Sequence, residues 1–252
     1  MRYFPFYFLK KIYKLKYLVF KYVINTKNPL KSIYGIYLTP SFKDVTFMYY
    51  LKGTYGFFLS DLIKNISNDS TFIDIGANQG LFSILAGKNE NIKEIIAFEP
   101  AFKTAELLRS NLACNQILNC TVIEKGISNK TGSLQLNTTE GHSGRSTFRE
   151  LKAGDNTRNE SVETINHEEI DKLIRENTNY IIKIDVEGHE EIVIDELIKC
   201  FFFKNVSLIF CEIDTAWVDV ETIKKKLFSS GFSKIKKIGR GESHYDILIS
   251  RN

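Results

Sequence analysis

Apolar and polar positions alternate along most of the chain in a pattern typical of α/β domains. From residue 71 onward, short apolar runs are followed by stretches whose apolar residues have helical spacing. Runs such as YIIKI and SLIF are apolar on both faces, as in a parallel sheet covered by helices on both sides. The pattern predicts a doubly wound α/β domain over residues 61–252. The expected strands are 71–75, 94–98, 120–126, 180–186 and 206–213, the expected helices are 80–89, 101–116, 188–199 and 217–230, and an antiparallel pair, 232–238 and 244–250, closes the chain.

Residues 127–170 interrupt this alternation. They are polar and contain several glycines, and the runs GSLQLN and SVETI indicate short β segments between mobile loops. An insert of this kind beside a binding crevice often holds the substrate, so we expect 127–170 to be the substrate region.

Residues 1–60 have a different composition and are predicted to form a basic, aromatic helical extension. Residues 1–52 contain ten Lys or Arg and one acid, a net charge of +9, so the remainder carries −5 of the overall +4. Lysines interrupt every window of about 20 residues, which excludes a membrane span, and a signal-peptide pattern is absent. Two interpretations stay open for residues 1–30: a helix packed on the catalytic domain, or an interfacial helix resting on an anionic membrane or beside a lipid-linked substrate.

The motifs and cysteines of the sequence indicate the expected partners and cellular compartment. No nucleic-acid-binding motif accompanies the basic segment, so we expect no nucleic acid partner. The four cysteines form no CxxC pair and no zinc spacing, which indicates reduced thiols in a cytoplasmic protein, with contact to the inner face of the membrane as the alternative. The oligomeric state is left open.

The stretch FIDIGANQG, residues 72–80, carries the first chemical signal. Its glycines do not match the GxGxxG dinucleotide pattern, and no Gly-Lys-Ser/Thr phosphate loop follows. Asp74 can bind an amine directly or through water, and the helix beginning near Gly80 can bind a carboxylate. Glu99, at the end of the next strand, can accept hydrogen bonds from both hydroxyls of a ribose. An amino-acid head and a ribose together match S-adenosylmethionine.

Four segments make the sequence resemble the FkbM family of class I S-adenosylmethionine-dependent methyltransferases. They are FIDIGANQGLFSILA, IIAFEPAFKTAELLRSNL, GISNKTGSLQL and IIKIDVEGHEEIVIDEL, over roughly residues 70–215. The resemblance implies a Rossmann-like sheet of seven strands with the last antiparallel, and methyl transfer, usually to oxygen. Many relatives belong to polysaccharide or natural-product pathways. The expected cofactor contacts are Asp74, Gly76, Asn78, Gly80, Glu99, Pro100, Gly126 and Asp185, with the adenine against 124–127.

The run KIDVEGHE provides the catalytic candidates Asp185, Glu187 and His189. A sugar hydroxyl is a weak acid, so its methylation needs a base, and His189 could serve because its unperturbed pKa is about 6.5. The alternative is structural: Asp185 orders the loop, Glu187 caps a helix and His189 lies at the surface. Mg²⁺ held by Asp185, Glu212 and Asp214 is possible but not favoured, because the resemblance does not require it.

The run EGHSGRSTF, residues 140–148, offers substrate contacts through His142, Ser143, Arg145 and Ser146, or else is a flexible surface loop. These features predict an S-adenosylmethionine-dependent O-methyltransferase that acts on a sugar hydroxyl of a glycan, glycolipid or related metabolite. The alternatives are transfer to nitrogen or to a non-sugar small molecule, and a non-catalytic binding protein. DVEG stands where DNA N-methyltransferases carry Asn/Asp-Pro-Pro-Tyr/Phe, which argues against that class.

Overall fold

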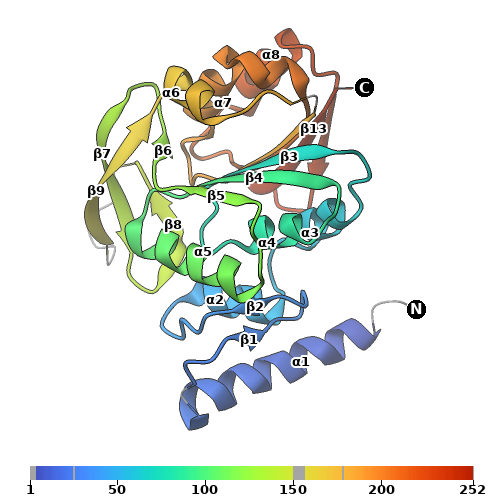
Figure 1. Cartoon of the computed structure of the whole chain (residues 1–252), viewed down its shortest axis with the longest axis vertical. Coiled ribbons are helices and arrows are strands. Elements are labelled where there is room, and N and C mark those ends of the chain that lie inside the picture. The colour runs from blue at the N-terminus through green and yellow to red at the C-terminus, as the bar shows by residue number, and fades with distance from the viewer. Residues whose placement is uncertain (1–3, 25, 150–156, 178, 252) are drawn as a thin grey trace.

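The main structural unit is a large sheet covered by helices on both faces (Figure 1). The computed structural model describes residues 4–24, 26–149, 157–177 and 179–251. Within this part, seven strands form the main sheet in the order β12-β13-β11-β10-β3-β4-β5. Neighbours run parallel except β13, which is antiparallel to both β11 and β12. In chain order the strands are β3 (Ser70–Ile75), β4 (Ile92–Phe98), β5 (Cys120–Ile123), β10 (Tyr180–Ile184), β11 (Val206–Asp214), β12 (Lys234–Ile238) and β13 (His244–Ser250).

Helices cover both faces because the strands are apolar on both sides. Helices α6, α7 and α8 lie on one face and α3, α4 and α5 on the other (Figure 1). The first face buries Ile73 and Ile182, and the second buries Phe72 and Ile181, so alternate residues of one strand enter two different cores. The helices are α3 (Phe57–Lys64), α4 (Leu81–Gly87), α5 (Phe102–Cys114), α6 (His167–Leu173), α7 (Glu190–Lys199), the 3₁₀ turn η2 (Phe201–Asn205) and α8 (Val220–Ser229). The predicted doubly wound fold, with its last strand antiparallel, is confirmed.

The expected insert forms a second sheet beside the main one. Its order is β6-β9-β7-β8 in the described residues. The segments GSLQLN and SVETI lie in β7 and β9, and part of the expected strand 120–126 turns away from the main sheet to form β6. Residues 150–156 of the insert lie outside the described residues. The strands of this small sheet are β6 (Gly126–Ile127), β7 (Gly132–Thr139), β8 (His142–Thr147) and β9 (Thr157–Ile165).

The N-terminal segment consists of a long helix followed by irregular structure packed on the main unit. Tyr17 is buried with Leu30 and Phe47 in the same core as the α3–α5 face of the main sheet. The expected boundary at residue 60 falls inside α3. No described helix is both long and apolar enough to cross a membrane. The elements here are α1 (Phe4–Val19), the π turn η1 (Phe20–Ile24), β1 (Leu30–Lys31), β2 (Tyr37–Leu38) and α2 (Val45–Lys52).

Candidate active site

A cavity of about 600 Å³ opens where the parallel strands end. Its floor comes from the carboxyl ends of β3, β4, β10 and β11, and its other walls come from β8 and from residues 46–55. Strand order reverses between β3 and β10, and ligands of doubly wound sheets bind at such a point. The structure thus brings together residues that are far apart in the sequence.

Glu99 forms one end of the cavity. Its carboxylate accepts hydrogen bonds from the backbone N–H of Asn78 at 2.8 Å and of Ala101 at 3.0 Å. Burial raises the pKa of Glu99 to about 7, although these two hydrogen bonds oppose the shift. Two oxygens held in fixed directions beside a cavity can accept hydrogen bonds from a pair of neighbouring hydroxyls. Pro100 also lines this end.

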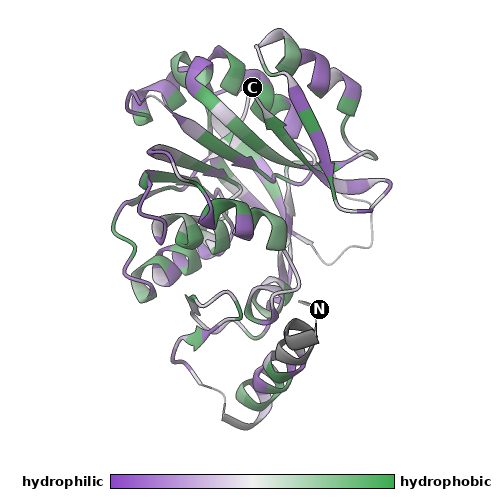
Figure 2. Ribbon diagram, turned by 90° about the vertical axis from the view of Figure 1, so that its right-hand side faces the viewer, coloured by the Kyte–Doolittle hydropathy of each residue, from purple (hydrophilic) through white to green (hydrophobic). Residues whose placement is uncertain are grey.

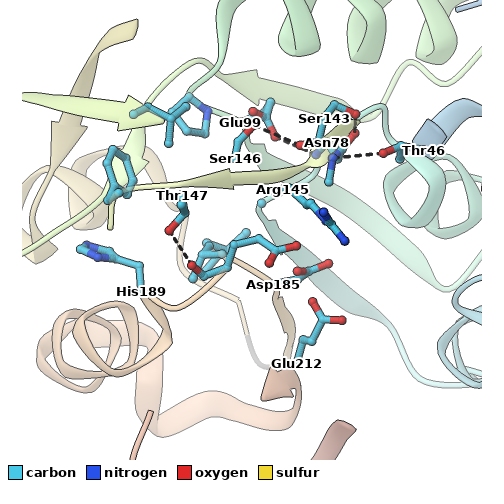
Figure 3. Close-up of a pocket in the computed structure, with 18 of the residues that line it drawn as sticks. Thr46, Asn78, Glu99, Ser143, Arg145, Ser146, Thr147, Asp185, His189 and Glu212 are labelled. Atoms are coloured by element: carbon cyan, nitrogen blue, oxygen red, sulfur yellow. Dashed lines mark hydrogen bonds between the residues drawn. The ribbon is translucent and has the colours of Figure 1, made fainter. Parts of the chain in front are cut away.

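Asn78 connects the glycine loop to the insert. Its backbone is left-handed, with φ 51°, and its side-chain oxygen accepts a hydrogen bond from Ser143 at 2.9 Å. The side chain of Gln79 donates to both Ser143 and Asp44, at 3.2 and 2.9 Å. The three segments that surround this side of the cavity are therefore joined by side-chain hydrogen bonds (Figure 3).

Asp74 lies behind the cavity wall. It is fully buried, accepts a hydrogen bond from Ser83 at 2.6 Å, and is 3.3 Å from the ammonium of Lys183. Lys183 is opposite Asp74 in the β3–β10 register, and both side chains contact α4, Asp74 through Ser83 and Lys183 through the ring of Phe82. The Asp74 carboxylate is fully buried and is not part of the cavity lining, so this arrangement leaves no direct contact between Asp74 and an amine in the cavity, and the contact through water stays a prediction.

Gly76 and Gly80 both allow close packing, Gly76 against backbone and Gly80 against a side chain. Gly76 has φ 74°, and a Cβ there would lie 1.9 Å from the backbone oxygen of Asp185, so only glycine lets the ends of β3 and β10 approach this closely. Gly76 lines the cavity. Gly80 instead packs against Leu108, where a Cβ would lie 2.4 Å from a methyl group.

A group of carboxylates occupies the opposite end of the cavity. Oxygens of Asp185, Glu187 and Glu212 lie within 4.8 Å of one another, whereas Asp214, the third residue of the expected metal set, is not in this group. Asp214 lines the cavity nearby, and Glu212 contacts His244 at 2.9 Å. Such all-oxygen groups can bind Mg²⁺.

Protons are distributed unequally among these carboxylates. Burial would raise the pKa of Asp185, but the Lys183 charge and hydrogen bonds from Glu212 and Tyr55 bring it below its usual value. Burial and the adjacent Asp185 raise the pKa of Glu212 far above its usual range, which favours its protonated form beside the Asp185 carboxylate. Burial and Asp185 also raise the pKa of Glu187, to about 8. The cluster therefore combines a fixed anion with a group that titrates near neutral pH.

His189 is part of the cavity lining, between the ring of Phe148 and the hydroxyl of Ser128. Its ring lies 5.0 Å from that of Phe148, and one ring nitrogen is 3.3 Å from the hydroxyl of Ser128. Burial, with a smaller effect of Arg149, lowers the pKa of His189 to about 4. Figure 3 shows His189 apart from Asp185 and Glu212. The alternative of an ordinary surface residue is wrong, since only 9% of His189 is exposed.

The expected adenine wall is only partly present. Lys125, Gly126 and Ile127 line the cavity, whereas Glu124 forms an ion pair with Arg109 at 2.8 Å.

The expected substrate residues His142, Ser143 and Arg145 lie on β8 and line the cavity, as does Ser146. The ring of His142 contacts that of Tyr49 edge-on at 6.0 Å. Arg145 forms none of the ion pairs found among the described residues.

Residues of the N-terminal segment complete the cavity, and sequence reasoning missed them. Tyr55 donates a hydrogen bond to Asp185 at 2.7 Å, and Thr46 accepts one from the backbone of Gly144 at 3.0 Å. Tyr49 and Tyr50 also line the wall. No motif in residues 44–55 connects them to residues 140–190, so the sequence gives no signal for them.

Comparison with known proteins supports the resemblance. The model of the methyltransferase FkbM domain matches residues 74–234, more than half of the chain. The chain belongs to the FkbM methyltransferase family. The match includes Glu99, Arg145 and the three clustered carboxylates, and it begins after the N-terminal wall of the cavity.

Individual proteins similar to this FkbM chain match it at lower identity or over part of its length. The methyltransferase sdnD of Sordaria araneosa is 36% identical over 75 residues, and the match spans 29% of each chain. The structure of TrmK from M. capricolum with S-adenosylhomocysteine has a TM-score of 0.47 at 15% identity, over 79% of this chain and 69% of that one. A ribosomal protein L11 methylase from Lactobacillus delbrueckii subsp. bulgaricus has a TM-score of 0.45 at 14% identity, over 77% and 76%.

Proposed function

We propose that this protein transfers a methyl group from S-adenosylmethionine to a hydroxyl oxygen, and that the acceptor is a sugar of a glycan, glycolipid or related metabolite. One observation carries the proposal: a single cavity connects Glu99, suited to a ribose, with a carboxylate cluster suited to accepting a proton. Membership of the FkbM family supports methyl transfer.

The residues around Glu99 are compatible with the methyl donor. A ribose needs two adjacent acceptors, which the Glu99 carboxylate supplies, and Gly76 leaves room for a close approach to the backbone. A cavity of about 600 Å³ is in the range of about 300–1,000 Å³ typical of sites for small molecules. When bound, the donor supplies an electrophilic methyl group on its sulfonium.

We infer that Glu187 accepts the proton of the acceptor hydroxyl. A base is most effective when its pKa is near the working pH, and burial brings the pKa of Glu187 to about 8. Asp185 is a weaker base because Lys183 and Tyr55 stabilise its charge. Burial lowers the pKa of His189 to about 4, which makes it the poorer candidate.

The acceptor side of the cavity supports a polar substrate with hydroxyl groups. Ser143 and Arg145 provide polar contacts, and Tyr49 and Trp217 provide aromatic surface. Arg145 forms none of the ion pairs of the described residues, although its charge acts on the nearby Glu187, so its guanidinium could bind a carboxylate or phosphate of the acceptor. Transfer to nitrogen or to a non-sugar small molecule is the second candidate. Mg²⁺ bound by Asp185, Glu187 and Glu212 is an alternative way to lower the pKa of the acceptor hydroxyl.

Thermal melting tests the donor. S-adenosylhomocysteine should raise the melting midpoint by mass action, whereas NAD should not. Radiolabelled S-adenosylmethionine, incubated with glycan, lipid and small-molecule fractions, then tests the acceptor. Label in the glycan or glycolipid fraction, in an alkali-stable ether, supports the proposal, and label on nitrogen contradicts it. The same reaction with and without EDTA tests the metal.

A further inference from the structure

An apolar stripe faces outward on the N-terminal helix. Ile12 is 46% exposed, Leu15 64% and Tyr22 71%, and Leu18 adds to the same side. Residues 12, 15 and 18 are three positions apart along α1 and lie on one side of it, and Tyr22 follows in the π turn η1. We call these four residues the α1 docking face. Figure 2 shows α1 at one end of the molecule with hydrophobic and hydrophilic residues interleaved.

The orientation of α1 is fixed by contacts on its other side. The hydroxyl of Tyr13 donates to the backbone oxygen of Ser32 at 3.2 Å, and that of Tyr17 donates to the oxygen of Phe42 at 3.3 Å. The ammonium of Lys16 binds the oxygen of Lys31 at 3.0 Å. An amphipathic helix normally packs its apolar face on the core, but here tyrosines fill that side and aliphatic residues remain in water.

The charge around this face indicates which partner it takes. Residues 1–43 contain nine Lys or Arg and no acid, and Lys14 is exposed beside the docking face. Aliphatic residues flanked by lysines bind an anionic bilayer surface, because the side chains enter the interface while the ammonium groups meet lipid headgroups. A second copy of the chain is a poor partner, since two such helices would repel each other.

We propose that the α1 docking face binds the surface of an anionic membrane and holds the protein there. Helix α2 lies between α1 and the cavity: Phe47 packs against Tyr17, with ring centroids 6.5 Å apart, while Thr46 and Tyr49 line the cavity. Membrane binding therefore places the cavity one helix away from the lipid-bound element.

Vesicle co-sedimentation of the full chain tests this proposal. The protein should sediment with vesicles of phosphatidylcholine plus phosphatidylglycerol, and weakly with phosphatidylcholine alone. Raising the salt concentration should reduce binding. Replacing one exposed lysine, Lys14→Gln, should weaken binding about fivefold, as expected for about 1 kcal/mol per charge.

A matched pair of variants distinguishes binding through the α1 docking face from nonspecific hydrophobic binding to vesicles. Ile12→Glu combined with Leu15→Glu should weaken binding at least tenfold with an unchanged melting midpoint, because both side chains are exposed. Leu118→Glu changes a leucine that is 95% exposed elsewhere and should bind like the parent. Equal binding by the double variant, or no preference for anionic lipid, overturns the proposal. The proposal is also overturned if the parent forms a dimer and does not bind vesicles, and the double variant loses that dimer.

Discussion

The replacement Glu99→Gln separates cofactor binding from folding. In the free protein, Glu99 is 6% exposed and burial raises its pKa from 4.5 to about 7. A carboxylate with a raised pKa stabilises the fold fully below about pH 4.5, and this contribution is lost as the pH rises through about 7. The shift corresponds to about 3 kcal/mol at 1.36 kcal/mol per unit.

At pH 8 the folded parent buries an ionised carboxylate at position 99, which destabilises it, and Glu99→Gln removes this charge. The replacement also removes a hydrogen bond. The amide nitrogen of Gln cannot accept a hydrogen bond, so the N–H of either Asn78 or Ala101 loses its acceptor, at a cost of about 1–3 kcal/mol. The two effects nearly cancel at pH 8, so the melting midpoint should change little. Hydrogen bonds to a charged group contribute about 1.5–3 kcal/mol, so the affinity for S-adenosylhomocysteine should fall about 100-fold.

Calorimetric titration with S-adenosylhomocysteine measures this change. The parent should bind more tightly as the pH rises from 6 to 8, because Glu99 ionises, and Glu99→Gln should lack this dependence. Glu90→Gln, an exposed carboxylate after α4, is the matched control and should bind like the parent. Affinity of Glu99→Gln within threefold of the parent would refute the assignment of Glu99 to the ribose.

Three further replacements test the rest of the site. Lys183→Met leaves Asp74 and Asp185 without their cation, so the free energy of unfolding should fall by about 3–5 kcal/mol in denaturant titrations. Adding Asp74→Asn to this variant should recover part of the loss. An unchanged midpoint for Lys183→Met contradicts the pairing. Glu187→Gln should lower kcat about 100-fold or more with unchanged binding of S-adenosylhomocysteine, and loss of binding instead would place it at the donor. His189→Gln should lower kcat less than tenfold, and a larger loss with an altered pH profile would make His189 the base.

The strand ends were predictable because parallel strands place their carboxyl ends at one edge. Glu99 follows β4, and Asp185 follows β10, so both were expected at the crevice, and both line the cavity. Asp74 shows the limit of this reasoning. It precedes the last residue of β3, and alternation turns its side chain to the same side as Phe72, away from the cavity.

Lys183 could have been recognised as its partner. A lysine inside the apolar run YIIKI must find compensating charge, and the β3–β10 register puts it opposite Asp74. The N-terminal wall could not have been predicted, since Tyr55 meets Asp185 across 130 positions through tertiary packing alone. The choice of Glu187 over His189 as the base also could not be predicted. It depends on how burial shifts the two pKa values, and the spacing of residues in KIDVEGHE does not show which side chains are buried.

The structure of the protein bound to S-adenosylhomocysteine is the most direct test of the central claim. We expect both ribose hydroxyls within hydrogen-bond distance of the Glu99 carboxylate, and the sulfur directed toward Asp185 and Glu187. A nucleoside bound away from the end of β4, or no binding at millimolar ligand, would contradict the account.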